Sequence, residues 1–405
     1  MAARALLILI GIATSFNFSA IGLVFYGEIA MAVVAPWIIL HKCGDRGFWN
    51  RPLFVCLVCL TVTMASYVVS DLINQTGLDN VVRGWGRLLF IYTDILFLYG
   101  FCYGAPINLS FFCLGMGIGD FTMALLNERP GYTWKFGYGV PVTMLAVLWL
   151  CANRRRISPS FGAGVLVGLA AIHMALDFRS FSALCLILAL VLMHMNSPQR
   201  SWARFGLLPL TLVVLIGVGG VYYLYRNSEQ LYDTRRHDSN AYRKSGIVTA
   251  LTAISQSPIV GFGSWAYNPE LQWVFQQSIS DEGSRLTARY EAHSQILQAW
   301  YEGGIFATFF LVYLGFGIGR GCFYIIRCRP PDSLTLVYSL FLFISSWDLF
   351  MSPFAGYLRL RISITAVVIL LLRAEQETAR ARAWRANHAN TQLVHYSTVG
   401  GKALV

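Results

Sequence analysis

The longest polar interruption of this sequence lies between residues 235 and 305, and it reads RRHDSNAYRKSGIVTALTAISQSPIVGFGSWAYNPELQWVFQQSISDEGSRLTARYEAHSQILQAWYEGGI. Apolar runs of about 20 residues recur along most of the remaining chain, each long enough to cross a hydrocarbon core roughly 30 Å thick. Such runs must form helices, because no water is available there to satisfy the backbone. The contrast predicts an all-α, polytopic membrane protein with one long polar loop.

The composition supports this fold class. Of the 405 residues, 56% are hydrophobic and only 13% are charged, which excludes an ordinary soluble domain. A net charge of +11 would suggest a nucleic-acid partner if the basic residues formed one patch. They gather instead between apolar runs, as in membrane proteins, so we expect membrane lipids and no nucleic acid as partners.

The basic segments between apolar runs set the predicted topology. The segments HKCGDRGFWNR, NRRRISPS and SPQRSWAR carry the strongest basic clusters and are expected in the cytoplasm. This arrangement gives about twelve spans, with both termini cytoplasmic and the long loop on the outer face. The first apolar run, residues 4–41, is interpreted as two shorter spans with a turn at Tyr26, Gly27 and Glu28, and not as a removed signal.

The expected organisation therefore has four parts. Residues 1–225 hold spans one to nine, residues 226–302 form the outer loop, and residues 303–374 hold spans ten to twelve. Residues 375–405 form a basic cytoplasmic tail that we expect to be mobile. None of the nine cysteines lies in the outer loop, so no structural disulfide is expected, and the pair Cys56 and Cys59 inside a span is interpreted as packing.

Several arginines oppose the positive-inside bias, since this topology places them outside. They are Arg83, Arg87, Arg129, Arg179, Arg226, Arg235, Arg236, Arg243, Arg285 and Arg289.

Within the outer loop, the pattern of apolar residues predicts two helices. Ile247, Val248, Leu251 and Ile254 have helical spacing and would let the first helix lie against the spanning bundle. Pro258, Gly261 and Gly263 end that helix. A second helix is expected to start near Ala288, with His293 at its beginning, and Gly303 and Gly304 break it before the next span.

These residues carry a family resemblance. Arg243, then Pro258, the Gly261-x-Gly263 turn and His293 in EAHSQILQAWYEGGI resemble the hallmark region of the O-antigen ligase and polymerase superfamily. The segment DFRSFSAL around Arg179 also resembles that family's arginine-containing hairpin ahead of the long periplasmic loop. The chain departs from the family pattern in having Ser294 after the histidine and Ile247 four residues after Arg243.

The resemblance implies a GT-C-like glycosyltransferase of a bacterial inner membrane, with its active site facing the periplasm. Its donor would be an undecaprenyl-diphosphate-linked glycan and its acceptor a lipid A-core. Arginine offers a permanently charged, bidentate donor to diphosphate oxygens, and such charges can stabilise the leaving group without a metal or other cofactor. An imidazole suits removal of the acceptor proton near neutral pH. Direct attack by the acceptor would invert the anomeric centre.

The catalytic candidates are therefore His293 as base, with Arg243 and Arg179 for the diphosphate. Further candidates for binding the diphosphate are Arg83, Arg87, Arg235, Arg236 and Arg289, for which a solvated or lipid-facing charge is the competing interpretation. We expect no metal ligands.

Three functions remain open at this point. An O-antigen ligase joins a completed polymer to the lipid A-core, whereas a polymerase would join repeat units on the same carrier, and the motif does not separate them. From another class, a polyprenyl-glycan transporter would require charged or broken helices near the membrane midplane and two related halves. The preference for the ligase rests on the single long loop late in the chain and is an argument from analogy.

Overall fold

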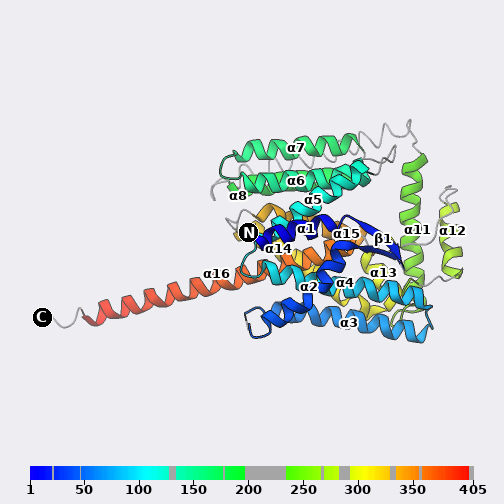
Figure 1. The fold of residues 1–405 in the computed structure, drawn as a ribbon, viewed down its shortest axis with the longest axis horizontal. Helices are drawn as coiled ribbons and strands as arrows, with labels where there is room; N and C mark the ends of the chain where they lie inside the picture. The colour runs from blue at the N-terminus through cyan, green and yellow to red at the C-terminus, as the bar shows by residue number, and fades with distance from the viewer. Residues whose placement is uncertain are drawn as a thin grey trace.

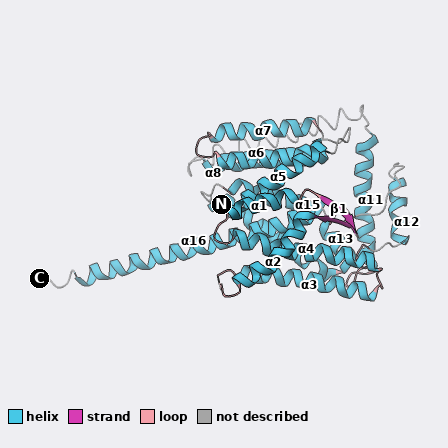
Figure 2. Cartoon of the chain, viewed as in Figure 1, coloured by secondary structure: helices cyan, strands magenta, loops and turns pink. Residues whose placement is uncertain are grey.

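The computed structural model describes residues 1–20, 22–45, 47–126, 134–176, 178–196, 234–265, 269–281, 292–328, 334–354 and 358–400. Nearly all of these residues are helical, so the predicted all-α class is confirmed. The helices are α1 (Ala2–Ala13), α2 (Tyr26–Lys42), α3 (Arg51–Ile73), α4 (Leu78–Cys102), α5 (Asn108–Leu126), α6 (Gly139–Ala152), α7 (Pro159–Ala175), α8 (Arg179–Asn196), α11 (Thr234–Gln256), α12 (Pro269–Asp281), α13 (Gln295–Gly303), α14 (Phe309–Cys328), α15 (Thr335–Met351) and α16 (Arg359–Gly400). A π-helical turn, η1 (Trp134–Tyr138), precedes α6, and a 3₁₀ turn, η3 (Ile305–Thr308), precedes α14. Within the described ranges the strands β1 (Asn17–Ala20) and β2 (Gly22–Phe25) pair as one antiparallel hairpin (Figure 2).

Five helical segments of the described chain are long and apolar enough to cross a membrane. They are α3, α4, α5, α8 and the segment Ile305–Cys328 that joins η3 to α14. The helices α1, α6, α7 and α15 are apolar but shorter. Large apolar side chains face outward, as expected for contact with lipid: Leu40 is 75% exposed and Phe316 76%. The chain is therefore a polytopic membrane protein. The number of spans stays a prediction, and the predicted ninth span lies outside the described residues.

The apolar helices lie side by side, and α11 and α12 lie across one end of this bundle (Figure 1). The β hairpin and the α3–α4 turn lie at that same end, whereas the α2–α3 and α6–α7 connections lie at the other. The chain thus turns at opposite ends of the bundle before and after α3. We refer to the end with α11 and α12 as the polar-helix end.

Helix α1 packs closely on α5 through glycines. A Cβ atom at Gly11 would lie 2.3 Å from the carbonyl oxygen of Phe112, and one at Gly115 would lie 2.2 Å from that of Ile8. Small residues permit such backbone contact, and the gain in van der Waals packing holds helices together in lipid, where apolar burial drives no association.

One sequence expectation about the end of a span is wrong. Tyr26, Gly27 and Glu28 form the first turn of α2, and the chain reverses earlier, through the β hairpin. Gly27 serves close packing instead of a turn, since a Cβ there would lie 2.4 Å from the Thr14 methyl carbon. In the tail, α16 continues as one helix to Gly400 and projects from the bundle (Figure 1), and its mobility stays a prediction.

Candidate functional site at the polar-helix end

Helices α11, α12 and α13 share a small apolar core of their own. Ala250, Ala253 and Ile254 of α11 pack with Leu271 of α12 and Tyr301 of α13. The expected apolar face is only partly correct, because Val248 and Leu251 are 41% and 53% exposed. Ala250 and Ala253 form the buried face of α11 instead, and their small side chains allow the helix to approach its neighbours. The helix therefore packs against α12 and α13 at the end of the bundle.

His293 lies against α11. Its ring meets that of Tyr242 edge-on, with centroids 5.0 Å apart, and Tyr242 in turn meets the buried ring of Phe275 on α12 at 5.1 Å. Arg243 follows Tyr242 directly and is close enough for its charge to act on the imidazole. Burial, and then the positive charge of Arg243, lower the pKa of His293 from 6.5 to about 4. The structure thus brings two of the predicted catalytic residues together and keeps the histidine neutral at physiological pH.

Ser294 fixes the position of His293. Its hydroxyl accepts a hydrogen bond from the Leu297 amide (3.4 Å), which caps α13, and donates one to the Leu349 carbonyl of α15 (3.1 Å). Helix α13 therefore begins at Gln295 instead of near Ala288, which lies outside the described residues. His293 stands just before the helix, at the point where Ser294 ties the loop to a spanning helix.

The Gly261-x-Gly263 turn is bonded to the end of α13. The amides of Phe262 and Gly263 donate to the carbonyls of Tyr301 and Glu302, both at 2.8 Å. The Ile305 amide returns a bond to the Pro258 carbonyl at 3.1 Å. Gly261 has a φ of +78° and Gly263 of +91°, a left-handed conformation that glycine adopts without strain. The turn therefore joins α11 to the segment that enters the membrane.

Gly304 offers a sharp test of this junction. It has a φ of +78°, and an added Cβ would lie 1.8 Å from the Ile259 carbonyl oxygen. We expect Gly304→Ala to lower the free energy of unfolding by more than the roughly 1–3 kcal/mol of backbone strain alone. Gly104 is the matched control, because its φ is +77° but nothing lies within 4 Å of a Cβ there. Thermal denaturation of the purified variants measures both effects, and equal losses would contradict the proposed close contact.

The Gly-x-Gly turn is also anchored to α3. The Asp71 carboxylate accepts hydrogen bonds from the Ser264 amide (2.6 Å) and hydroxyl (2.8 Å), and from the indole nitrogen of Trp85 (2.8 Å). The Ser70 hydroxyl accepts from the Gly263 amide at 3.0 Å. Asp71 and Ser70 are both buried. The turn consequently has a fixed place on the ends of α3 and α4.

Arg87 lies beneath this turn and is fully buried. Its guanidinium donates to Glu302 of α13 at 2.6 Å, to the Tyr67 hydroxyl at 3.0 Å and to the Phe354 carbonyl at 2.5 Å. It also lies over the ring of Trp265, 4.5 Å from the centroid. The expectation that Arg87 contacts the diphosphate is therefore corrected: in this structure the guanidinium is occupied by protein groups. It was misassigned because the positive-inside rule locates a residue along the membrane normal and says nothing of burial.

The remaining predicted residues have different surroundings. Arg83 lies one turn before Arg87 on α4 and is half-buried beside Gly22 of the hairpin. Arg179 is exposed as the first residue of α8, which begins at the polar-helix end. Arg235 and Arg236 belong to the first turns of α11, and the positions of their side chains are outside what the structure describes. Arg289 lies outside the described residues.

Sequence reasoning missed the residues that hold the loop in place, above all Asp71 and Glu302. Each is an acidic residue at the end of an apolar run, where a solvated charge is the ordinary interpretation. Their partners lie more than 190 positions away in the chain, at Ser264 and Arg87 respectively. No local feature of the sequence marks either residue as one that holds the loop.

Fold and site together define a class: a multi-pass helical membrane protein with a neutral histidine and an arginine among polar helices at one end. Residues 172–312 match the family described as O-antigen ligase. The predicted resemblance to the ligase and polymerase superfamily is therefore confirmed over this segment. No curated protein gives a significant match to the chain.

Proposed function

We propose that the protein is an O-antigen ligase that transfers a glycan from undecaprenyl diphosphate to a lipid A-core at the periplasmic face of the bacterial inner membrane. The observation that carries this proposal is the neutral His293 beside Arg243 inside the segment that matches the family. A proton acceptor and a permanent positive charge are the two groups that this transfer requires.

The chemistry assigns each group one task. The acceptor hydroxyl attacks the anomeric carbon, His293 takes its proton, and the bond from that carbon to the diphosphate oxygen breaks. The electron pair leaves with the carrier diphosphate, whose growing charge Arg243 and Arg179 stabilise. A single displacement of this kind inverts the anomeric centre. Arg83, Arg235, Arg236 and Arg289 remain candidates for contact with the diphosphate.

Because arginines supply the charge, we propose that transfer needs no metal ion. We expect the purified protein to retain full transfer activity in excess EDTA. The assay is glycan transfer to lipid A-core in detergent or liposomes, with and without added Mg²⁺. Loss of activity that a divalent ion restores would contradict metal independence and leave the assignments of His293 and Arg243 standing.

The lowered pKa of His293 predicts an unusual pH profile. The imidazole binds its proton only as the pH falls through about 4, so the base stays available well below its ordinary pKa of 6.5. We expect kcat/KM to be level from neutral pH down to about 5 and to fall on further acidification. Arg243→Gln removes one cause of the shift and should move the acidic limb upward, whereas Arg243→Lys should not. An acidic limb near 6.5 in the wild-type protein would contradict the assigned environment.

A gel of lipopolysaccharide tests the function itself, and it separates the ligase from the polymerase that the same family includes. Disruption of a ligase gene leaves core without O-antigen, while carrier-linked polymer accumulates. Disruption of a polymerase gene leaves core capped by single repeat units. The second pattern would assign the same catalytic residues to a polymerase. Unchanged ladders would refute both functions.

A further inference from the structure

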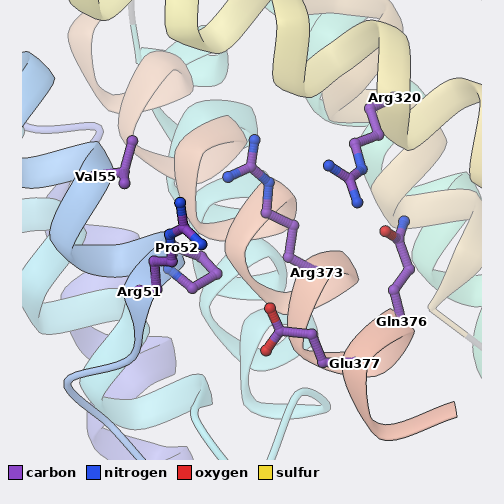
Figure 3. A pocket seen from close by; sticks show the side chains of 7 residues that line it. All are labelled: Arg51, Pro52, Val55, Arg320, Arg373, Gln376 and Glu377. Carbon is purple, nitrogen blue, oxygen red and sulfur yellow. The ribbon is translucent and has the colours of Figure 1, made fainter. Parts of the chain in front are cut away.

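A pocket of about 380 Å³ lies where α3, α14 and α16 meet (Figure 3). Three helices line it: α3 contributes its first residues, α14 contributes Arg320, and α16 contributes the residues after its apolar part. Its volume falls in the range of small-ligand sites, roughly 300–1,000 Å³. The lining residues are Arg51, Pro52, Val55, Arg320, Arg373, Gln376 and Glu377.

The pocket is separate from the proposed catalytic site. Arg51 is the first residue of α3, and Asp71, which holds the Gly-x-Gly turn, lies near the end of the same helix. At 1.5 Å per residue these two positions are roughly 30 Å apart, about the thickness of the hydrocarbon core. The predicted topology places the pocket at the cytoplasmic face.

The arginines of the pocket lack an ionic partner among the described residues. Within the described residues no carboxylate forms an ion pair with Arg51, Arg320 or Arg373. The Arg373 Nε is buried without a hydrogen-bond partner, and its guanidinium lies over the ring of Tyr313 at 5.2 Å. Gln376 is only 8% exposed, yet in the described part of the chain its amide has no partner either. Three positive charges and one negative charge, from Glu377, therefore face a space that holds free hydrogen-bond donors.

This set of groups matches a phosphate. Guanidinium groups bind phosphate oxygens in a bidentate manner, and a carboxamide adds a neutral donor. Figure 3 shows the Arg373 guanidinium of α16 between Arg51 of α3 on one side and Arg320 of α14 with Gln376 on the other. The net charge of the lining favours an anion of one or two charges.

The outer surface next to the pocket favours a lipid over a soluble phosphate. Val55, in the pocket wall, is 37% exposed, and Val58 one turn later on α3 is 42% exposed. On α14, Phe316 lies one turn before Arg320 and is 76% exposed. An apolar surface thus continues from the basic pocket along two helices toward the middle of the membrane, where acyl chains would lie.

We propose that this pocket binds the phosphodiester head group of an anionic phospholipid of the cytoplasmic leaflet. Basic pockets between spanning helices on this side of a membrane are suited to such head groups. The site is independent of glycan transfer, and a bound lipid would tie α16 to α3 and α14 where α16 leaves the bundle.

The test is native mass spectrometry of the full-length protein in detergent, titrated with phosphatidylglycerol, with phosphatidylcholine or with inorganic phosphate. We expect phosphatidylglycerol to bind more tightly than phosphatidylcholine. The double variant Arg51→Gln/Arg320→Gln should weaken phosphatidylglycerol binding by about 25-fold, at about fivefold for each arginine. Glu377→Gln removes the opposing charge and should tighten binding.

The matched control is Arg155→Gln/Arg156→Gln, which removes two exposed arginines from the α6–α7 loop at the same end of the bundle. It should leave binding unchanged. Equal binding of the two lipids, or equal losses in the two double variants, would refute the pocket as the site. Inorganic phosphate that binds alone as tightly as the lipid would overturn the lipid assignment in favour of a soluble anion. The Glu377→Gln result keeps the test decisive if the arginine variants fold poorly.

Discussion

Replacing His293 with alanine is expected to lower the rate of glycan transfer by about a hundredfold to ten-thousandfold, the usual contribution of a general base. The ring is held between Tyr242 of α11 and the Ser294 cap of α13, which keeps it in one position. The measurement is transfer of labelled glycan by the purified variant, supported by lipopolysaccharide ladders in cells.

His41→Ala is the control for this variant. His41 is exposed at the opposite end of the bundle, where it stacks on Trp37, and its loss should leave transfer unchanged. Arg243→Ala should resemble His293→Ala in rate, because both act on one bond-breaking step. If long ladders persist in His293→Ala and Arg243→Ala cells with normal amounts of membrane protein, the catalytic assignment is wrong.

Replacing Glu302 with alanine is expected to produce the largest loss of stability. Its carboxylate binds the Arg87 guanidinium at 2.6 Å, and both side chains are almost fully buried. It also accepts from the Tyr67 hydroxyl at 2.8 Å and from the Gln298 amide at 2.9 Å. Removal of one partner from a buried pair leaves an uncompensated charge, which costs about 3–5 kcal/mol. Thermal and chemical denaturation of the purified protein measure this loss.

A double variant separates the cost of the unpaired charge from loss of packing. Arg87→Leu/Glu302→Leu removes both charges and should recover a large part of the stability, because apolar residues can replace a buried pair. Lys42→Ala is the control, since the Lys42–Asp45 pair is exposed at 3.9 Å and is worth at most about 1 kcal/mol. A Glu302→Ala variant as stable as Lys42→Ala would refute the importance of the buried pair.

Much of the candidate site was predictable from sequence because its chemistry needs particular residue types. Arg243, Pro258, Gly261, Gly263 and His293 were identified by their order in the family motif. What the motif did not contain was the support beneath them. Asp71, Ser70 and Trp85 belong to helices that look like ordinary spans, and nothing in their local sequence indicates that they hold the Gly-x-Gly turn.

The sequence by itself determined the class of this protein. Long runs of apolar residues indicate spanning helices, and the distribution of basic residues predicts their orientation, because both effects act on each segment separately. The order of polar residues in the outer loop likewise determined which side chains are available for chemistry.

Only the tertiary structure decided which arginine is free and which is occupied. Arg83 and Arg87 lie one turn apart and look alike in sequence, yet Arg87 is enclosed by Tyr67, Glu302 and Phe354. The same holds for the polar stretch of residues 235–305. Only glycine fits at position 304, because an added Cβ atom would lie 1.8 Å from the Ile259 carbonyl oxygen. Burial and pairing depend on partners brought together from distant parts of the chain, and no local pattern encodes them.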